Sequence, residues 1–71
     1  MDIKKEYKEL DKIAQIIRSA GYKAYDQLYG YSTTGNLNYI TRKDSARDRI
    51  KDIDIFTVKK YVIENKFELL R

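Results

Sequence analysis

The stretch IKKEYKELDKIAQIIRSA, residues 3–20, contains the clearest structural signal in this 71-residue chain. Its apolar residues recur at steps of three and four, which is the spacing of one face of an α-helix. Lysines and glutamates fill the opposite face. Asp2 can cap the start, and Gly21 stands where a residue in the left-handed conformation commonly ends a helix. The pattern predicts a helix from about Ile3 to Ala20 whose apolar stripe faces a core or a dimer seam.

Residues 22–41 fit two different structures. Ala24, Leu28 and Tyr31 have the spacing of a short helix that ends near Ser32. The same residues could instead form a hairpin, with strands at 28–32 and 37–41, and the tyrosines of this segment favour strands by propensity. Two strands alone are marginally stable, however, and no convincing third strand is present. We favour the helix, with the hairpin as its alternative.

The chain after residue 43 predicts two more helices. Asp44 or Ser45 can cap a third helix that extends to Ile53, and Asp52 or Asp54 can open a fourth. β-branched residues crowd the fourth segment, so a strand is the alternative there. Two adjacent lysines in the middle of that segment interrupt the alternation of a strand and suit the outer face of a helix. Both segments are therefore expected to be helical.

These segments together predict an all-α fold, a compact bundle of about four short helices in one domain over residues 1–71. Residues 67–71 are expected to form either a frayed turn or a tail docked on a partner. A core this small seldom supplies more than ~3–5 kcal/mol, and self-association is a common remedy. Seven tyrosines, which suit interfaces, support a homodimer. The residues expected in the core or the dimer seam are Tyr7, Leu10, Ile13, Ile17, Leu28, Tyr31, Ile50, Val58 and Val62.

Composition argues against several functional classes. Apolar residues make up 42% of the chain and charged residues 37%, which does not fit a disordered tail. No stretch approaches the ~18 apolar residues of a membrane-spanning helix. Without Cys or His, the chain lacks thiolate metal sites and the commonest general base. Asp52, Asp54 and Lys59 faintly suggest a nuclease, but capping explains both aspartates. We expect a cytoplasmic protein that is not an enzyme and holds no metal or cofactor.

The densest charge lies in residues 42–51, RKDSARDRIK, with five bases against two acids. On a helix, Arg47 and Lys51 share a face, and Arg42 can fold back towards them. Such a cluster binds carboxylates, phosphates or an acidic protein surface through forked hydrogen bonds. Arg42, Arg47, Lys51 and Arg49 are therefore the candidate partner-binding residues. A solvated helix face with local ion pairs is the alternative interpretation.

Nucleic-acid binding is the alternative function. A helix carrying Arg47, Arg49 and Lys51 could enter a major groove. Aspartates on the same segment would repel phosphates, however, and counterion release needs an uninterrupted basic face. A protein partner with an acidic surface is therefore favoured.

Short motifs follow one another between residues 21 and 51. They are Gly21-Tyr22, Gln27-Leu28, Gly30-Tyr31, Thr34-Gly35-Asn36, Tyr39-Ile40-Thr41-Arg42, Ala46-Arg47 and Ile50-Lys51. In order and spacing they resemble the signature of the IreB/ReoM family, small cytoplasmic regulatory phosphoproteins of Gram-positive bacteria. With the fourth helix included, the similarity covers about residues 7–63. No single motif is specific, and the combination carries the resemblance.

The resemblance implies a helical homodimer and a non-enzymatic regulator. Family members are substrates of a transmembrane, cell-wall-sensing Ser/Thr kinase and adjust peptidoglycan synthesis and cephalosporin resistance. In one branch, the unphosphorylated protein promotes degradation of a cell-wall enzyme by a Clp-type protease. The implied partners are thus the Clp machinery or a cell-wall biosynthesis enzyme. Arg42 and Arg47 match arginines that matter in the family, Lys51 is a conservative replacement, and Ile55 stands where the family has another arginine.

Two departures from the family pattern stand out. Family members carry phosphorylated threonines in a flexible tail before the first helix, whereas here no Ser or Thr precedes Ser19. Family prolines are replaced by Ala24, Leu37 and Thr41. We therefore expect a divergent member without the usual phosphorylation switch, which acts as an adaptor through its arginine surface.

Overall fold

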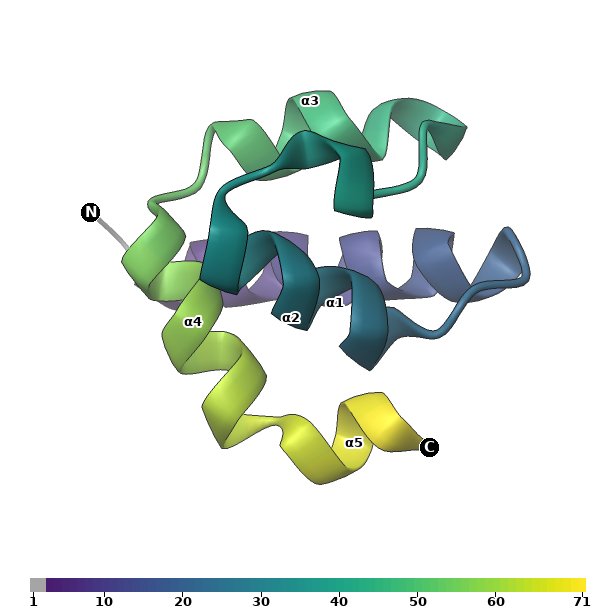
Figure 1. Cartoon of the computed structure of the whole chain (residues 1–71). Coiled ribbons are helices and arrows are strands. Elements are labelled where there is room, and N and C mark those ends of the chain that lie inside the picture. Colours follow the sequence, from purple (N-terminus) through teal and green to yellow (C-terminus); the bar gives the residue numbers. More distant parts are fainter. Residues whose placement is uncertain (1–2) are drawn as a thin grey trace.

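Helices form the regular structure of this protein throughout residues 3–71, the part of the chain that the computed structural model describes (Figure 1). The elements are α1 (Ile3–Ser19), α2 (Ala24–Thr34), the 3₁₀-helices η1 (Leu37–Tyr39) and η2 (Lys43–Ser45), α3 (Ala46–Lys51), α4 (Ile55–Glu64) and α5 (Lys66–Leu70). The expected all-α fold is confirmed, and within these residues no strand occurs. In Figure 1, α1 runs behind α2, α3 lies above them, and α4 and α5 close the opposite side.

The first helix matches its sequence pattern closely. It ends at Ser19, and Gly21 follows with a φ of 89°, the left-handed conformation expected at a helix end. The N–H of Tyr22 donates to the carbonyl of Ile17 at 3.2 Å and so satisfies one of the last free acceptors. The expected cap at Asp2 lies outside the described residues. The apolar face of α1 packs against α2, α3 and α4 and is therefore the centre of the bundle.

The ambiguous middle segment is helical, so the hairpin alternative is wrong. α2 continues two residues beyond the expected end and stops at Gly35, whose φ is 73° and whose N–H donates to Tyr31 O at 2.7 Å. Ala24, Leu28 and Tyr31 are buried on one face. Helical spacing buries these three side chains while α2 packs against both α1 and α4. This burial outweighs the strand propensity of the tyrosines.

The third helix is shorter than its pattern suggested. α3 spans Ala46–Lys51, and Ile53 lies beyond it in the connection to α4. Asp44 and Ser45 both have positive φ, 50° and 61°, and Ser45 makes no side-chain capping bond, so the predicted cap there is wrong. The reason is local geometry, because a capping side chain needs extended backbone at that position. At α4, Asp54 is the cap as expected and accepts from Phe56 N at 2.8 Å.

The end of the chain forms a fifth short helix, which corrects the expected count of four. Leu69 of α5 is buried, and the Arg18 guanidinium donates to the Glu68 carbonyl at 2.7 Å. A cation at this end of a helix satisfies a carbonyl that has no partner within the helix. The C-terminal segment therefore packs against α2 and is joined to α1 through Arg18, as a helix where a frayed turn was one of the two expectations.

One hydrophobic cluster joins all the α-helices. The residues expected in a core or dimer seam lie as follows: Leu10, Ile13, Ile17, Leu28, Tyr31, Ile50, Val58 and Val62 are buried, and Tyr7 is half-buried. These side chains are thus covered within a single chain. An interface with a second copy would therefore have to be formed by other apolar residues.

Two tyrosines link α1 to α4 at the edge of this cluster. The rings of Tyr7 and Tyr61 meet edge to face with centroids 5.2 Å apart. The Tyr61 hydroxyl donates to Asp11 Oδ1 at 2.6 Å, and the Tyr7 hydroxyl donates to Glu64 Oε1 at 2.8 Å. Burial and the bond to Glu64 raise the pKa of Tyr7 to about 12. Burial and the bond to Asp11 also raise the pKa of Tyr61.

These pKa shifts predict a loss of stability at alkaline pH. The unfolded chain releases tyrosine protons near pH 10, whereas folded Tyr7 and Tyr61 retain theirs, so the free energy of unfolding falls above pH ~10. Tyr61, the more buried of the two, should contribute a slope of up to about 1.4 kcal/mol per pH unit, and Tyr7 less. Urea unfolding measured between pH ~8 and ~11.5 checks this. Tyr61→Phe should reduce the slope; an unchanged slope would contradict the assignment.

Candidate functional site

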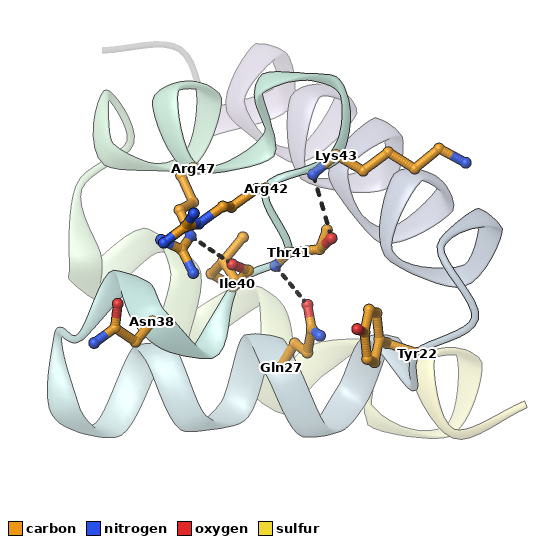
Figure 2. Close-up of a pocket in the computed structure, with 8 residues that line it drawn as sticks. All are labelled: Tyr22, Gln27, Asn38, Ile40, Thr41, Arg42, Lys43 and Arg47. Carbon is orange, nitrogen blue, oxygen red and sulfur yellow. Dashed lines mark hydrogen bonds between the residues drawn. The ribbon is translucent and has the colours of Figure 1, made fainter.

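Two arginines from different elements line one surface hollow of about 400 Å³, here called the arginine hollow (Figure 2). Arg42 directly precedes η2, and Arg47 lies in the first turn of α3. The remaining lining residues are Tyr22, Gln27, Asn38, Ile40, Thr41 and Lys43. The hollow thus lies between the start of α2, the loop around η1 and the start of α3.

Hydrogen bonds fix the floor of the arginine hollow. Gln27 Oε1 accepts from the backbone N–H of Thr41 at 2.9 Å, which attaches the loop to α2. Arg47 Nε donates to the Ile40 carbonyl at 2.7 Å, which attaches α3 to the same loop. The side chain of Ile40 is buried, so the loop cannot shift without disturbing the core. Both bonds are drawn in Figure 2.

The bond from Nε leaves the two terminal nitrogens of Arg47 available. Within residues 3–71, neither these nitrogens nor the guanidinium of Arg42 has a hydrogen bond or ion pair to another protein group. Lys43 differs, because its ammonium donates to the Ser19 carbonyl at 3.3 Å, and its chain extends away from the arginines in Figure 2. Of the three cations that line the hollow, Arg42 and Arg47 are therefore the ones whose terminal nitrogens remain available to a ligand.

The residues that line the arginine hollow include several hydrogen-bond donors and no carboxylate. Gln27 uses its amide oxygen on Thr41 and so presents an NH₂ group, and the Asn38 amide and the Tyr22 hydroxyl add further donors. A group surrounded by guanidinium and amide donors is held best if it is an anion with several acceptor oxygens. The arrangement can therefore bind an oxyanion.

The structure separates the four predicted partner-binding residues. Arg42 and Arg47 share the arginine hollow. Arg49 donates to Glu9 Oε1 at 2.7 Å and thus joins α3 to α1, while Lys51 pairs with Asp48 at 3.4 Å. Neither Arg49 nor Lys51 lines the hollow. Glu9 therefore offsets the charge of Arg49, and Asp48 offsets that of Lys51. The pair of Lys51 is a local ion pair of the kind that the alternative interpretation predicted.

Sequence reasoning missed the polar walls of the hollow. Gln27 and Thr41 are fourteen positions apart in the chain, and their bond exists only after α2 packs against the loop. The available signal was their place in the shared family motifs. Tyr22 likewise stands in the Gly21-Tyr22 motif, whereas no pattern pointed to Asn38.

A glycine holds the loop close to α2. An added Cβ at Gly30 would lie 2.4 Å from Cδ1 of the Tyr39 ring, which rests on this position. η1 can therefore approach the helix only where no side chain intervenes. That approach places Asn38 and Ile40, on either side of Tyr39, at the hollow.

Gly30→Ala should displace the Tyr39 ring and lower the free energy of unfolding by about 1–2 kcal/mol, because overpacking outweighs the gain in helix propensity. In a Tyr39→Ala background the same change should be neutral or stabilising by up to about 1 kcal/mol, since the obstacle is gone. Urea unfolding of the four chains of this double-mutant cycle measures the coupling. Additive effects would contradict the contact.

The remaining chemistry of the described residues is sparse. Residues 3–71 include no group of three or more His, Cys, Asp or Glu side chains that could hold a metal ion. None of the helices in this range is long and apolar enough to cross a membrane.

The structure is thus a small helical domain whose surface carries a hollow lined by two arginines and by amide and hydroxyl groups. The model of the IreB regulatory phosphoprotein family matches residues 2–67 of the 71-residue chain. The protein therefore belongs to this family of regulatory phosphoproteins, as the motifs between residues 21 and 51 indicated. A comparison with solved structures gives no significant match.

Proposed function

We propose that this protein is a non-enzymatic regulatory adaptor that docks an acidic feature of a partner protein in the arginine hollow. The observation that carries this proposal is the pairing of Arg42 and Arg47 on one hollow whose walls contain no carboxylate. Charge-assisted, forked hydrogen bonds from arginine are about twice as strong as neutral ones. Membership of a regulatory phosphoprotein family supports a role in control.

The resemblance to IreB/ReoM proteins supplies the biological setting of the proposal. The protein would act in the cytoplasm of a Gram-positive bacterium, under a cell-wall-sensing Ser/Thr kinase, on peptidoglycan synthesis and cephalosporin resistance. Its partner would be a Clp-type protease component or a cell-wall biosynthesis enzyme.

We further propose that the protein is a homodimer that pairs through the apolar α4–α5 face, which comprises Phe56, Ile63 and Phe67. These side chains are 72%, 76% and 82% exposed. Phe56 and Ile63 are two helical turns apart on α4 and so share one side of it. Phe67 follows on the adjoining helix α5, and exposed large apolar residues commonly mark an interface when they form one patch.

The charges beside the apolar α4–α5 face favour a second copy as its occupant. Exposed charges of both signs follow one another here: Lys59, whose ammonium lies 5.8 Å from the centre of the Phe56 ring, then Lys60, Glu64, Lys66 and Glu68. Around a two-fold axis, one surface meets an identical surface, and a rim of both signs can then match opposite charges. A rim of one sign would repel its copy.

Binding of a partner to Arg42→Glu and Arg47→Glu variants tests the adaptor proposal. Affinity purification identifies the candidate partner, and titration with the purified partner then measures its dissociation constant. Loss of a charge-assisted pair costs about 1.5–3 kcal/mol, so each variant should weaken binding about 10- to 100-fold. Arg42→Glu is the cleaner change, because Arg47 also anchors the Ile40 carbonyl.

Lys8→Glu is the matched control, since Lys8 is exposed on α1 away from the hollow and the change in net charge is the same. Equal binding by Arg42→Glu and Lys8→Glu would reject the site. A shift of nucleic acid at ~0.15 M salt that is lost steeply as salt rises would instead support the nucleic-acid alternative.

A further inference from the structure

We infer that the arginine hollow is a binding site for a phosphomonoester dianion. This inference rests on the proposed function, because it specifies the acidic feature that the hollow receives. A carboxylate and a phosphate both suit arginine, so the inference depends on charge, on donor number and on space.

Charge favours the dianion. Arg42 and Arg47 bring two positive charges to one hollow, and no carboxylate in its walls offsets either of them. A single carboxylate would neutralise one arginine and leave the other beside it with no counter-charge. A phosphomonoester carries about −1.5 to −2 charges at pH 7 and matches both.

The arginine hollow is lined by several donor groups that approach it from different sides. Both guanidinium groups present terminal N–H groups, and Gln27 presents its NH₂ because its oxygen is occupied by Thr41 N. The Asn38 amide and the Tyr22 hydroxyl complete the wall. A phosphoryl group has three terminal oxygens that accept from several directions, whereas a carboxylate has two oxygens in one plane.

Two of the donor side chains, those of Arg47 and Gln27, are held in place before any ligand arrives. Arg47, which lines the hollow, is held through Nε by the Ile40 carbonyl at 2.7 Å, the bond drawn in Figure 2. The hollow, at about 400 Å³, is much larger than a phosphoryl group and has room for the residue that carries it. Tyr22, 56% exposed, presents a ring on which that residue can rest.

A second cationic hollow on the molecule lacks these properties. It is lined by Lys12 and Arg49, but also by Asp44. Arg49 there is already paired with Glu9 at 2.7 Å. Its positive charge is therefore offset by protein carboxylates, and it serves as an internal comparison.

Titration of the full ¹⁵N-labelled chain, followed by NMR, tests the inference. The probes are inorganic phosphate, N-acetyl-phosphothreonine methylamide and acetate, each at constant ionic strength set with sodium chloride. We expect saturable shifts at the Thr41 and Arg42 amides and the Gln27 side-chain NH₂ with both phosphates, and binding of acetate at least tenfold weaker. Tighter binding of phosphothreonine than of inorganic phosphate identifies a phosphorylated polypeptide as the source; equal binding identifies free phosphate.

Arg42→Gln should weaken phosphate binding at least tenfold, while Lys12→Gln, in the second hollow, should leave it unchanged. Acetate binding as tight as phosphate, or no saturable shift with either phosphate, would overturn the inference. If Arg42→Glu still abolishes partner binding in that case, the adaptor role stands, and the acidic feature consists of Asp or Glu side chains. If phosphate binds but Arg42→Glu leaves partner binding unchanged, the adaptor role is rejected and the anion site is retained.

Discussion

Leu28→Ala is expected to lower the free energy of unfolding by about 2–5 kcal/mol, the range measured for buried leucines truncated to alanine. Leu28 is 0% exposed on α2, and α2 packs against α1, α4 and α5. The cavity would therefore open between several helices, and relaxation of one helix could not fill it. A small domain has little stability to lose, often ~3–5 kcal/mol from its core, so a large fraction of the variant should be unfolded. Urea unfolding followed by far-UV circular dichroism measures the loss.

Leu70→Ala is the matched control because it is the same chemical change at a leucine that is 55% exposed on α5. It should change the free energy of unfolding by no more than about 0.5 kcal/mol. Both variants should be compared at one protein concentration, since self-association would make stability depend on concentration. Equal losses for the two leucines would show that Leu28 is not at the centre of the core.

Ile63→Glu is expected to convert a dimer into monomers. Ile63 is 76% exposed in the single chain and lies in the apolar α4–α5 face. A two-fold interface would contain the substituted residue twice, and both carboxylates would lose water without gaining a partner. We expect the dissociation constant to rise at least about 100-fold, which corresponds to ~2.7 kcal/mol. Sedimentation equilibrium across concentrations measures it.

Ile3→Glu is the control for this change, because Ile3 is an exposed isoleucine of α1 outside the apolar α4–α5 face. It should leave the dissociation constant unchanged. A wild-type chain that sediments as a folded monomer at ~100 μM would contradict the dimer. Equal effects of the two substitutions would place the interface elsewhere.

Local patterns predicted the helices where one apolar face and one terminal signal agreed. The helix predicted from Ile3 to Ala20 differs from α1 by one residue, because its apolar period and Gly21 point to the same structure. Asp54 was correctly placed among the caps of α4. At residues 28–41, strand propensity competed with helical spacing, and the family resemblance favoured the helix before the structure confirmed it.

Local patterns failed where backbone conformation or a distant contact decided the outcome. Ser45 has the right chemistry for a cap, but its left-handed backbone prevents it. Residues 67–71 have no clear period, and α5 is held by Arg18 from the other end of the chain. Neither effect is visible in the residues next to the segment concerned.

The sequence by itself determined the helical class, the position of the first helix and a cationic segment at residues 42–51. It also determined the family, since the motifs that define it are short and ordered along the chain. Only the tertiary structure decided which cations remain available: Glu9 of α1 pairs with Arg49, while Gln27 of α2 secures the loop that holds Arg47. The physical reason is that periodicity reports which face of a helix is buried, whereas charge pairing depends on which helices meet. One such meeting joins Tyr7 and Glu64, which are 57 positions apart in the chain.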